Sequence, residues 1–371
     1  MARFAFHGER LRLARVALGL TLDQLGARVS ATRQYLNQLE RGIKMPSEEM
    51  AAALAAALGI AVGFFRLPAD AGIRPEQCHF RKQRTTPVSI VSQVLARGAL
   101  LDDFVNRLDS ELDLPPVSFP DIPVTGIGEI EEAAEATRDH WRLGTGPISN
   151  MVRVVENAGA VVSFFRGVSE RVDALSIDSR RPMIIRSEAK PAACRLRFDL
   201  AHETGHLVMH RGVQTGDKPT EDQANRFASA FLLPRASFIH EFPRGRFLDW
   251  VAIFELKLRW KVSAQAILRR AYDLRLVSAD QYRTGYIHLS KTGQRRVERH
   301  DDEIPPEQPE LLPASIHALE LEFPGAVERI AGQAGLEPEM FSYVSGLELP
   351  VIPTYRDNVV PIHRYRSDPC R

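Results

Sequence analysis

Cysteine is scarce in this chain of 371 residues, which has only three, at positions 78, 194 and 370. Three widely spaced cysteines provide neither a disulfide framework nor a Cys-x-x-Cys metal site, and they fit a reducing compartment. No run of about 18 apolar residues occurs, and the opening MARFAFHGERLRLARV has no apolar segment before a cleavage site. We therefore expect a cytoplasmic protein with no membrane partner.

A strong charge of one sign is also missing, since the formal net charge is +1. Any nucleic-acid partner must therefore be argued from a local segment rather than from the whole chain. No Gly-rich phosphate loop and no Ser/His/Asp arrangement can be recognised. What remains is an ordinary globular composition, 44% hydrophobic and 26% charged, in a chain long enough for two or three domains.

Hydrophobic periodicity divides the chain into four parts and predicts a mainly helical α+β fold. Residues 1–70 are expected to form five short helices, and residues 71–125 a linker with one strongly periodic helix. Residues 126–300 mix helices with three strand-like segments, AVVSFFRG, VDALSIDS and RPMIIRS, which predict a small sheet. Residues 301–371 begin with an acidic, proline-rich stretch and are expected to form a helical extension that ends in a tail.

The first part has a turn between its second and third helices. TLDQLGARV has Thr21 as its expected N-cap, Ser30 marks the turn, and ATRQYLNQLERG follows as the third helix. The start of that third helix is polar and rich in amides, as is typical of side chains that read base edges in DNA. The candidate DNA contacts are Thr32, Arg33, Gln34, Asn37 and Gln38.

Residues 8–66 resemble the helix-turn-helix domain of the phage-repressor (XRE) family, and LERG matches the end of its third helix. The resemblance implies that the third helix enters the major groove of double-stranded DNA. The alternative is a helix-turn-helix fold that serves protein contacts only.

A second motif lies in RFDLAHETGHLVMHRG, where His202 and His206 are four residues apart. On a helix both side chains leave the same face, at a separation that lets two imidazoles meet one metal ion. Glu203 is displaced by one residue, so its carboxylate lies beside the ion, where it can take a proton from water. Apolar neighbours such as Leu200 and Leu207 indicate a core helix rather than two surface histidines.

A hydrolytic zinc site needs a third protein ligand and an open position. The next helix, TEDQANRFASAFLLP, begins with carboxylates, and Glu221 shares a face with two alanines that would let the helices approach closely. Glu221 is therefore the predicted third ligand. Asp222, Asp217 and His210 compete with it, although His210 would lie about 12 Å along the helix axis from His202.

The two segments RLRFDLAHETGHLVMH and EDQANRFASAFLLP closely resemble the signature segments of the ImmA/IrrE family of regulatory zinc peptidases, and the similarity extends over roughly residues 75–315. The resemblance implies a zincin-like peptidase domain in which His202, His206 and Glu221 hold zinc. It also implies that Glu203 is the catalytic base.

Two positions depart from the family pattern. Gln223 replaces a second glutamate, which favours Glu221 over that position as a ligand. Asp199 replaces a small hydroxyl residue one helical turn before Glu203, where a carboxylate would alter the pKa of the base.

Together these segments predict a DNA-binding transcriptional regulator fused to a zinc-dependent endopeptidase. Members of the resembled family cleave a helix-turn-helix repressor, which implies such a protein as substrate. A homodimer on a two-fold operator is a further expectation. Two alternatives remain, a transcription factor whose peptidase-like domain senses a small ligand or metal without turnover, and an antitoxin-like interaction protein. The intact Glu203 favours the enzyme, because a purely structural site needs no base.

Overall fold

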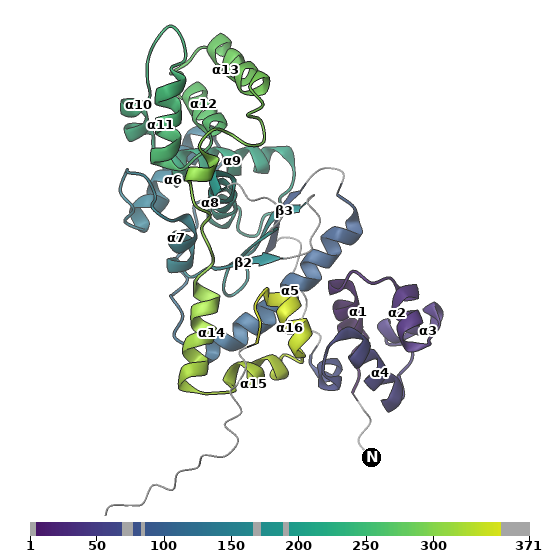
Figure 1. The fold of residues 1–371 in the computed structure, drawn as a ribbon. Helices are drawn as coiled ribbons and strands as arrows, with labels where there is room; N and C mark the ends of the chain where they lie inside the picture. The colour runs from purple at the N-terminus through teal and green to yellow at the C-terminus, as the bar shows by residue number, and fades with distance from the viewer. Residues whose placement is uncertain (1–4, 69–76, 83–85, 166–171, 188–192, 350–371) are drawn as a thin grey trace, which may run out of the picture.

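The computed structural model describes five stretches of the chain, residues 5–68, 77–82, 86–165, 172–187 and 193–349 (Figure 1). Helices dominate and surround one small sheet, so the expected mainly helical α+β fold is confirmed. The tail expected at the end of the chain, from residue 350, lies outside the described residues. None of the described helices combines the length and the hydropathy that crossing a bilayer requires.

The amino-terminal part is a bundle of four α-helices and one 3-10 helix, α1 Gly8–Ala17, α2 Leu22–Val29, α3 Arg33–Glu40, α4 Glu48–Leu58 and η1 Val62–Arg66. The side chain of Thr21 accepts the backbone N–H of Gln24, which makes it the N-cap of α2 as predicted. Ser30 ends α2 in the left-handed region, at φ 52°, and so turns the chain into α3. The helix-turn-helix arrangement is therefore built from local signals.

The sheet has four strands in the order β1-β3-β4-β2, with the bounds β1 Cys78–Lys82, β2 Val161–Phe165, β3 Val172–Ile177 and β4 Met183–Ser187. Strand β3 is antiparallel to both β1 and β4, and β2 is parallel to β4. The three predicted strands are confirmed. A strand around Cys78 was not predicted, because that segment becomes a strand only by pairing with β3, a contact distant in sequence.

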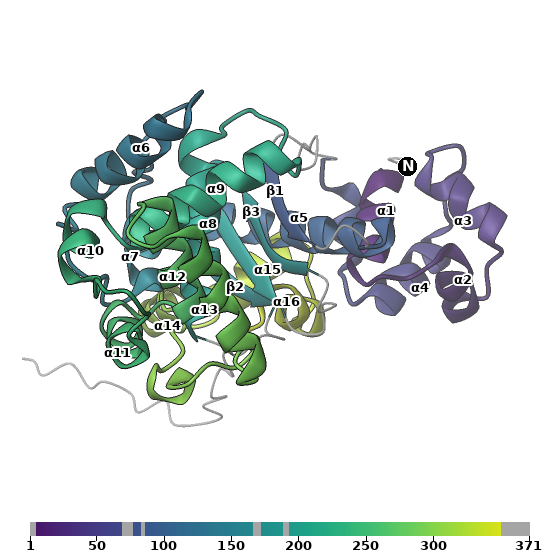
Figure 2. The same ribbon diagram turned by 90° about the horizontal axis from the view of Figure 1, so that it is seen from above.

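The two faces of the sheet pack against different helices (Figure 2). Helix α5 Val88–Glu111 covers one face, and a Cβ on its Gly98 would lie 2.8 Å from the Ile177 side chain, so the helix approaches the strands closely. On the other face, Val162 and Ile184 belong to a core shared with three helices, α6 Ile127–His140, α7 Met151–Asn157 and α8 Ala193–Met209. Helix α8 contains the HETGH motif, so the helix with the motif packs directly against this face of the sheet.

Further helices complete this second core, α9 Lys218–Leu232, α10 Arg235–Glu241, α11 Trp250–Trp260, α12 Ala264–Asp273 and α13 Ala279–Lys291. The proline-rich stretch at 112–124 is extended, as predicted for a linker, but it is anchored. Ser118 N–H donates to the Ala158 carbonyl at 2.9 Å, and Ile122 N–H donates to the Val208 carbonyl at 2.9 Å. A short 3-10 helix, η3 Asp301–Glu303, opens the acidic segment that follows α13.

The carboxy-terminal helices, α14 Leu311–Glu322, α15 Ala326–Gln333 and α16 Pro338–Ser345, return to the amino-terminal bundle (Figure 1). The Tyr343 hydroxyl donates to the Ala17 carbonyl at 3.0 Å, and Ala61 N–H donates to the Gly335 carbonyl at 3.0 Å. One continuous apolar core includes side chains of the bundle, of α5 and of α14–α16. The four-part division of the chain remains a prediction, but its first and last parts are packed together.

Glu156 of α7 lies against the amino end of α14, where both carboxylate oxygens accept the Glu310 N–H at 3.2 Å. Burial raises the pKa of Glu156 from 4.5 to about 7. The folded chain therefore binds more protons than the unfolded chain between these values, and its free energy of unfolding falls as the pH rises through them. We expect Glu156→Gln to gain stability relative to wild type between pH 4.5 and 8, by up to about 3 kcal/mol. Thermal unfolding at several pH values measures this, and a difference independent of pH would contradict it.

Candidate functional site

Helix α8 places the two motif histidines on one face, fully buried, with their Nε2 atoms 3.1 Å apart. Glu221, in the first turn of α9, reaches the same point from the neighbouring helix. Its Oε2 lies 3.4 Å from His202 Nε2, and its Oε1 lies 3.5 Å from His206 Nε2. Three residues that lie at most 19 positions apart in sequence thus bring three donor atoms together.

These distances fit a tetrahedral zinc ion. Two ligand atoms that each lie 2.0–2.1 Å from such an ion are about 3.3 Å apart. Within the described part of the chain, His202, His206 and Glu221 form the group whose possible ligand atoms all lie within 4.8 Å of one another. The donor set of two imidazoles and one carboxylate is the one that catalytic zinc uses when it keeps a fourth position open.

The competing carboxylates are engaged elsewhere. Asp222 forms an exposed ion pair with Lys218, with Oδ2 2.6 Å from Nζ. Asp217 is the N-cap of α9, where it accepts the Thr220 N–H at 3.0 Å. Neither side chain belongs to the three-residue group.

The environment keeps His206 in its neutral form, which is the form that binds metal. Burial lowers the pKa of His206 to about 3, although the Glu221 carboxylate opposes this shift. Burial would raise the pKa of Glu221, but its hydrogen bonds to His202 and His206 outweigh burial and hold that pKa well below its usual range. Glu221 is therefore ionised at neutral pH, as a ligand must be.

The outer nitrogens of both histidines have partners that fix the rings. His202 Nδ1 is 3.0 Å from Asn225 Oδ1 on α9. His206 Nδ1 is 2.9 Å from His210 Nδ1, and His210 Nε2 in turn is 2.8 Å from Gln223 Oε1. His210 thus orients His206 rather than joining the three donors, and Gln223 anchors His210. Such outer contacts orient the rings of metal-binding histidines.

Glu203 is fully buried and is held by a hydrogen bond from the sheet. The Ser176 hydroxyl of β3 donates to Glu203 Oε2 at 2.5 Å. The register of the sheet pairs Ser176 with His79 of β1, so both side chains face α8. The His79 ring stacks on the His206 ring, with centroids 4.9 Å apart and planes within 10° of parallel.

His79 itself is fully buried. Its Nδ1 is 2.7 Å from the Thr215 hydroxyl, and burial lowers its pKa to about 4. A neutral ring stacked on His206 restricts the movement of that ring.

Asp199, the second departure from the family pattern, faces Arg186 of β4. Its Oδ2 lies 3.0 Å from one guanidinium nitrogen, and both side chains are nearly inaccessible. A paired carboxylate has much less effect on a neighbouring acid than an unpaired one would. Arg186 therefore balances much of the charge through which Asp199 was expected to alter the pKa of Glu203.

The candidate DNA contacts lie on the outer end of the bundle, on α3, far from α8 and α9 in both views (Figures 1 and 2). Arg33, Gln34 and Asn37 are exposed, and Gln38 is half-buried. Thr32 is exposed and is the N-cap of α3, since its hydroxyl accepts the Tyr35 N–H at 3.2 Å. Leu36 and Leu39 hold the other face of α3 in the core.

Comparison with known families matches both parts of the chain. The model of peptidase family M78, described as the IrrE N-terminal-like domain, matches residues 155–272. A helix-turn-helix model matches residues 11–65. The chain has a helix-turn-helix domain followed by an IrrE-like domain. The match over 155–272 includes both motif histidines, Glu203 and Glu221.

Comparisons with curated proteins and with solved structures identify no further relative on which an inference can rest. A search of the curated proteins gives no match. Among solved structures, ComR from S. thermophilus, in complex with DNA and its signalling peptide ComS, is 13% identical over 88% of this chain and 98% of its own. The TM-score is 0.16, so no inference about this chain rests on that similarity.

Several residues of the IrrE-like site were missed from the sequence. Asn225 could have been found, because it lies four residues after Glu221 and so on the same face of α9. Ser176 and His79 could not, because their position depends on the pairing of β1 with β3. Cys78, the neighbour of His79 in sequence, is a buried core residue of the opposite face.

Gly205 lies inside the motif and allows α9 to approach α8. A Cβ at this position would lie 3.0 Å from the Phe227 ring, which is itself fully buried. We expect Gly205→Ala to destabilise the fold by about 1–3 kcal/mol, because the ring must move in a packed core. Glu221 is on the same helix as Phe227, so metal affinity should fall as well.

The matched control for this substitution is Gly332→Ala in α15, where an added Cβ meets nothing within 4 Å. That change should be neutral or stabilise by about 0.5–1 kcal/mol. Chemical denaturation of the two variants measures the contrast, and equal effects at both positions would contradict the close-approach argument.

Proposed function

We propose that this chain is a DNA-binding transcriptional regulator whose IrrE-like domain is a zinc-dependent endopeptidase. The proposal rests on the meeting of His202, His206 and Glu221, at 3.1–3.5 Å between donor atoms, beside the buried Glu203. As substrate we propose a helix-turn-helix repressor or another regulatory protein, and as compartment the cytoplasm.

In this proposal His202, His206 and Glu221 hold the ion, which when bound polarises a peptide carbonyl and makes water more acidic. Glu203 takes the proton of the attacking water through a carboxylate oxygen. The hydrogen bond from Ser176 fixes the rotamer of Glu203, so that the second carboxylate oxygen remains at a defined position. Asn225 and His210 hold the two rings so that their Nε2 atoms keep facing the ion.

The helix-turn-helix domain supports double-stranded DNA as the other partner, with Thr32, Arg33, Gln34, Asn37 and Gln38 as the proposed contacts. The side chains of Arg33, Gln34 and Asn37 are exposed and carry the groups that read guanine and adenine. A homodimer would present two copies of α3 to a two-fold operator.

For the DNA contacts, we expect Arg33→Ala in the full chain to weaken binding to the promoter of its own gene by about 1–3 kcal/mol. The ion pair of Arg33 with Asp23, at 3.4 Å, is exposed and contributes little, so the fold should be unaffected. Binding to random duplex should change little, because phosphate contacts dominate it. Fluorescence anisotropy on both duplexes measures this, with the exposed Arg235→Ala of α10 as control. Equal losses on both duplexes would remove the base-reading role.

The direct test of the peptidase is incubation with a helix-turn-helix repressor encoded near this gene. We expect one or two defined cuts, because a folded partner exposes few flexible segments. Cutting should stop when a chelator removes the metal and resume when zinc is restored. A repressor that stays intact under all conditions would contradict the assignment of substrate.

A second candidate function is a transcription factor that senses a small ligand through the IrrE-like domain without turnover. A large cavity beside α8 and α9 favours it. This candidate predicts DNA binding that changes with a ligand and no chelator-sensitive cutting of any regulator.

A further inference from the structure

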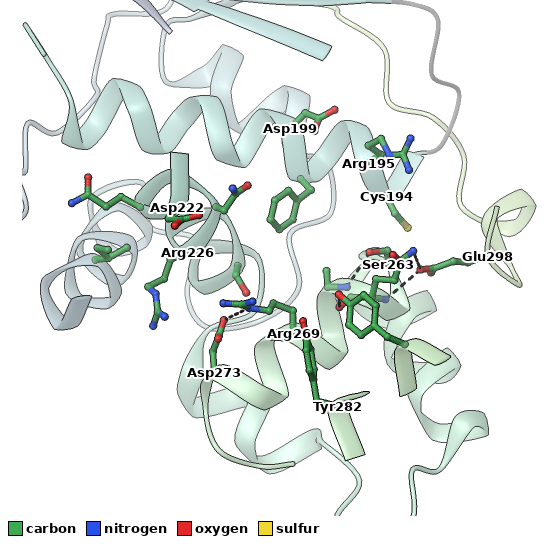
Figure 3. Close-up of a pocket in the computed structure, with 18 of the residues that line it drawn as sticks. Cys194, Arg195, Asp199, Asp222, Arg226, Ser263, Arg269, Asp273, Tyr282 and Glu298 are labelled. Atoms are coloured by element: carbon green, nitrogen blue, oxygen red, sulfur yellow. Dashed lines mark hydrogen bonds and ion pairs between the residues drawn. The ribbon is translucent and has the colours of Figure 1, made fainter. Parts of the chain in front are cut away.

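A cavity of about 760 Å³ lies between α8 and α9 on one side and α12, α13 and the segment at 296–301 on the other (Figure 3). In the close-up, Arg195 and Asp199 of α8 lie along one side, and Arg269 and Tyr282 lie opposite. Its size is within the range of about 300–1,000 Å³ typical of small-molecule sites. None of the three proposed zinc ligands lines it, and neither does Glu203, so it is separate from the metal centre.

Every carboxylate in the cavity wall already has a cationic partner. The pairs are Asp199 with Arg186, Asp222 with Lys218, Asp273 with Arg269, and both Glu298 and Asp301 with Lys257. Arg186 and Lys257 do not line the cavity themselves and approach these acids from behind the wall. Arg186 and Lys257 therefore neutralise part of the negative charge from outside, and Lys218 and Arg269 neutralise another part from within the wall.

Three arginines of the wall, Arg195, Arg226 and Arg296, have no carboxylate partner among the described residues. They come from three separate segments, α8, α9 and the chain after α13, and each lines the cavity. Guanidinium groups bind carboxylate, phosphate and sulfonate groups with paired hydrogen bonds. Positive charge is thus in excess in the cavity, and a bound anion would balance it.

Another part of the wall is apolar and aromatic. Phe198 of α8 and Ile130 of α6 line it, together with Tyr282 and Tyr286 of α13, whose rings lie 4.8 Å apart. An inorganic anion alone would leave this surface uncovered. The combination is suited to a ligand with a charged end and an apolar or aromatic body.

We propose that this cavity binds a small organic anion, with its charged group at Arg226 and Arg296 and its body against Phe198, Tyr282 and Tyr286. The ligand lies directly behind the metal centre. Asn225, which lines the cavity, contacts His202 Nδ1, and Gln223, which also lines it, holds His210 against His206. A ligand that moves either amide changes the orientation of a proposed zinc ligand, so ligand and metal affinities are coupled.

The anion site is tested with 8-anilinonaphthalene-1-sulfonate, an aromatic sulfonate whose fluorescence rises when it is buried, on the full chain. We expect saturable binding at one site, weakened about ten-fold or more in the double variant Arg226→Met, Arg296→Met, because two charge-assisted contacts are lost. The uncharged probe N-phenyl-1-naphthylamine should bind both proteins within about two-fold. The control is Arg283→Met, an exposed arginine of α13 that does not line the cavity.

Near-ultraviolet circular dichroism of each variant establishes that the fold is retained. Sulfonate binding that the double variant leaves unchanged would overturn the proposal. So would an equal loss of both probes, since this would show that the arginines only shape an apolar pocket.

The coupling rests on the proposed metal centre and has its own measurement. The dissociation constant of the sulfonate should differ about five-fold or more between zinc-loaded and chelated protein, and this difference should shrink in Asn225→Ala. A dissociation constant indifferent to zinc would overturn the coupling alone. Because sulfonate binding needs neither zinc nor cleavage, failure of the peptidase proposal and failure of the anion site give different results.

Discussion

Protein purified without chelators is expected to contain about one zinc ion per chain, and Glu221→Ala or His202→Ala is expected to lose most of it. Each change leaves two ligands in a site built for three, and the donor atoms that remain cannot enclose the ion. Asn225→Ala should cost less, about 10–100-fold in zinc affinity, because Asn225 only orients the His202 ring. Elemental analysis after dialysis and competition with a chelator measure both effects.

The controls for this experiment are the neighbouring carboxylates. Asp222→Ala and Asp217→Ala should keep the metal, since Asp222 pairs with Lys218 and Asp217 caps α9. Should Glu221→Ala retain full zinc while either of these variants loses it, the ligand assignment would be wrong.

Glu203→Gln is expected to keep zinc and to lose cleavage of the partner repressor by a factor of about 10²–10⁴. The amide has nearly the same shape as the carboxylate and can still accept from Ser176, but it cannot take a proton from water. Ser176→Ala should give a smaller loss, because it frees the rotamer of Glu203 without removing the base. Single-turnover cleavage with equal zinc loading separates these effects. Cleavage by Glu203→Gln at the wild-type rate would remove the assigned base.

The meeting of the three proposed ligands was largely predictable because they are close in sequence. His202 and His206 are one helical turn apart, and Glu221 begins the next helix, so the 3.6-residue period and one short loop determine where they meet. The cap of α2, Thr21, was equally predictable, since a capping side chain bonds to the backbone three residues on.

The sheet side of the same site was not predictable. His79 and Ser176 are about a hundred residues apart in sequence and become neighbours only through the register of β1 with β3. A shift of one residue in that pairing would turn the side chain of one of them to the opposite face. The cavity could not be predicted for a related reason. The residues of its wall are spread over positions 127 to 301 and come together only in the folded chain.

The packing of the carboxy-terminal helices on the amino-terminal bundle has a consequence for the abundance of active regulator. Phe341 of α16 and Phe64 of η1 are buried in one continuous core, so a cavity in either helix weakens the DNA-reading bundle itself. A core truncation such as Phe341→Ala typically costs about 3–5 kcal/mol, a large part of the stability of a domain. Inherited changes near residue 341 would therefore lower promoter occupancy in the cell by depleting folded protein, although they lie about 300 residues from α3 in sequence. Genetic screens for lost DNA binding should recover them alongside changes in α3.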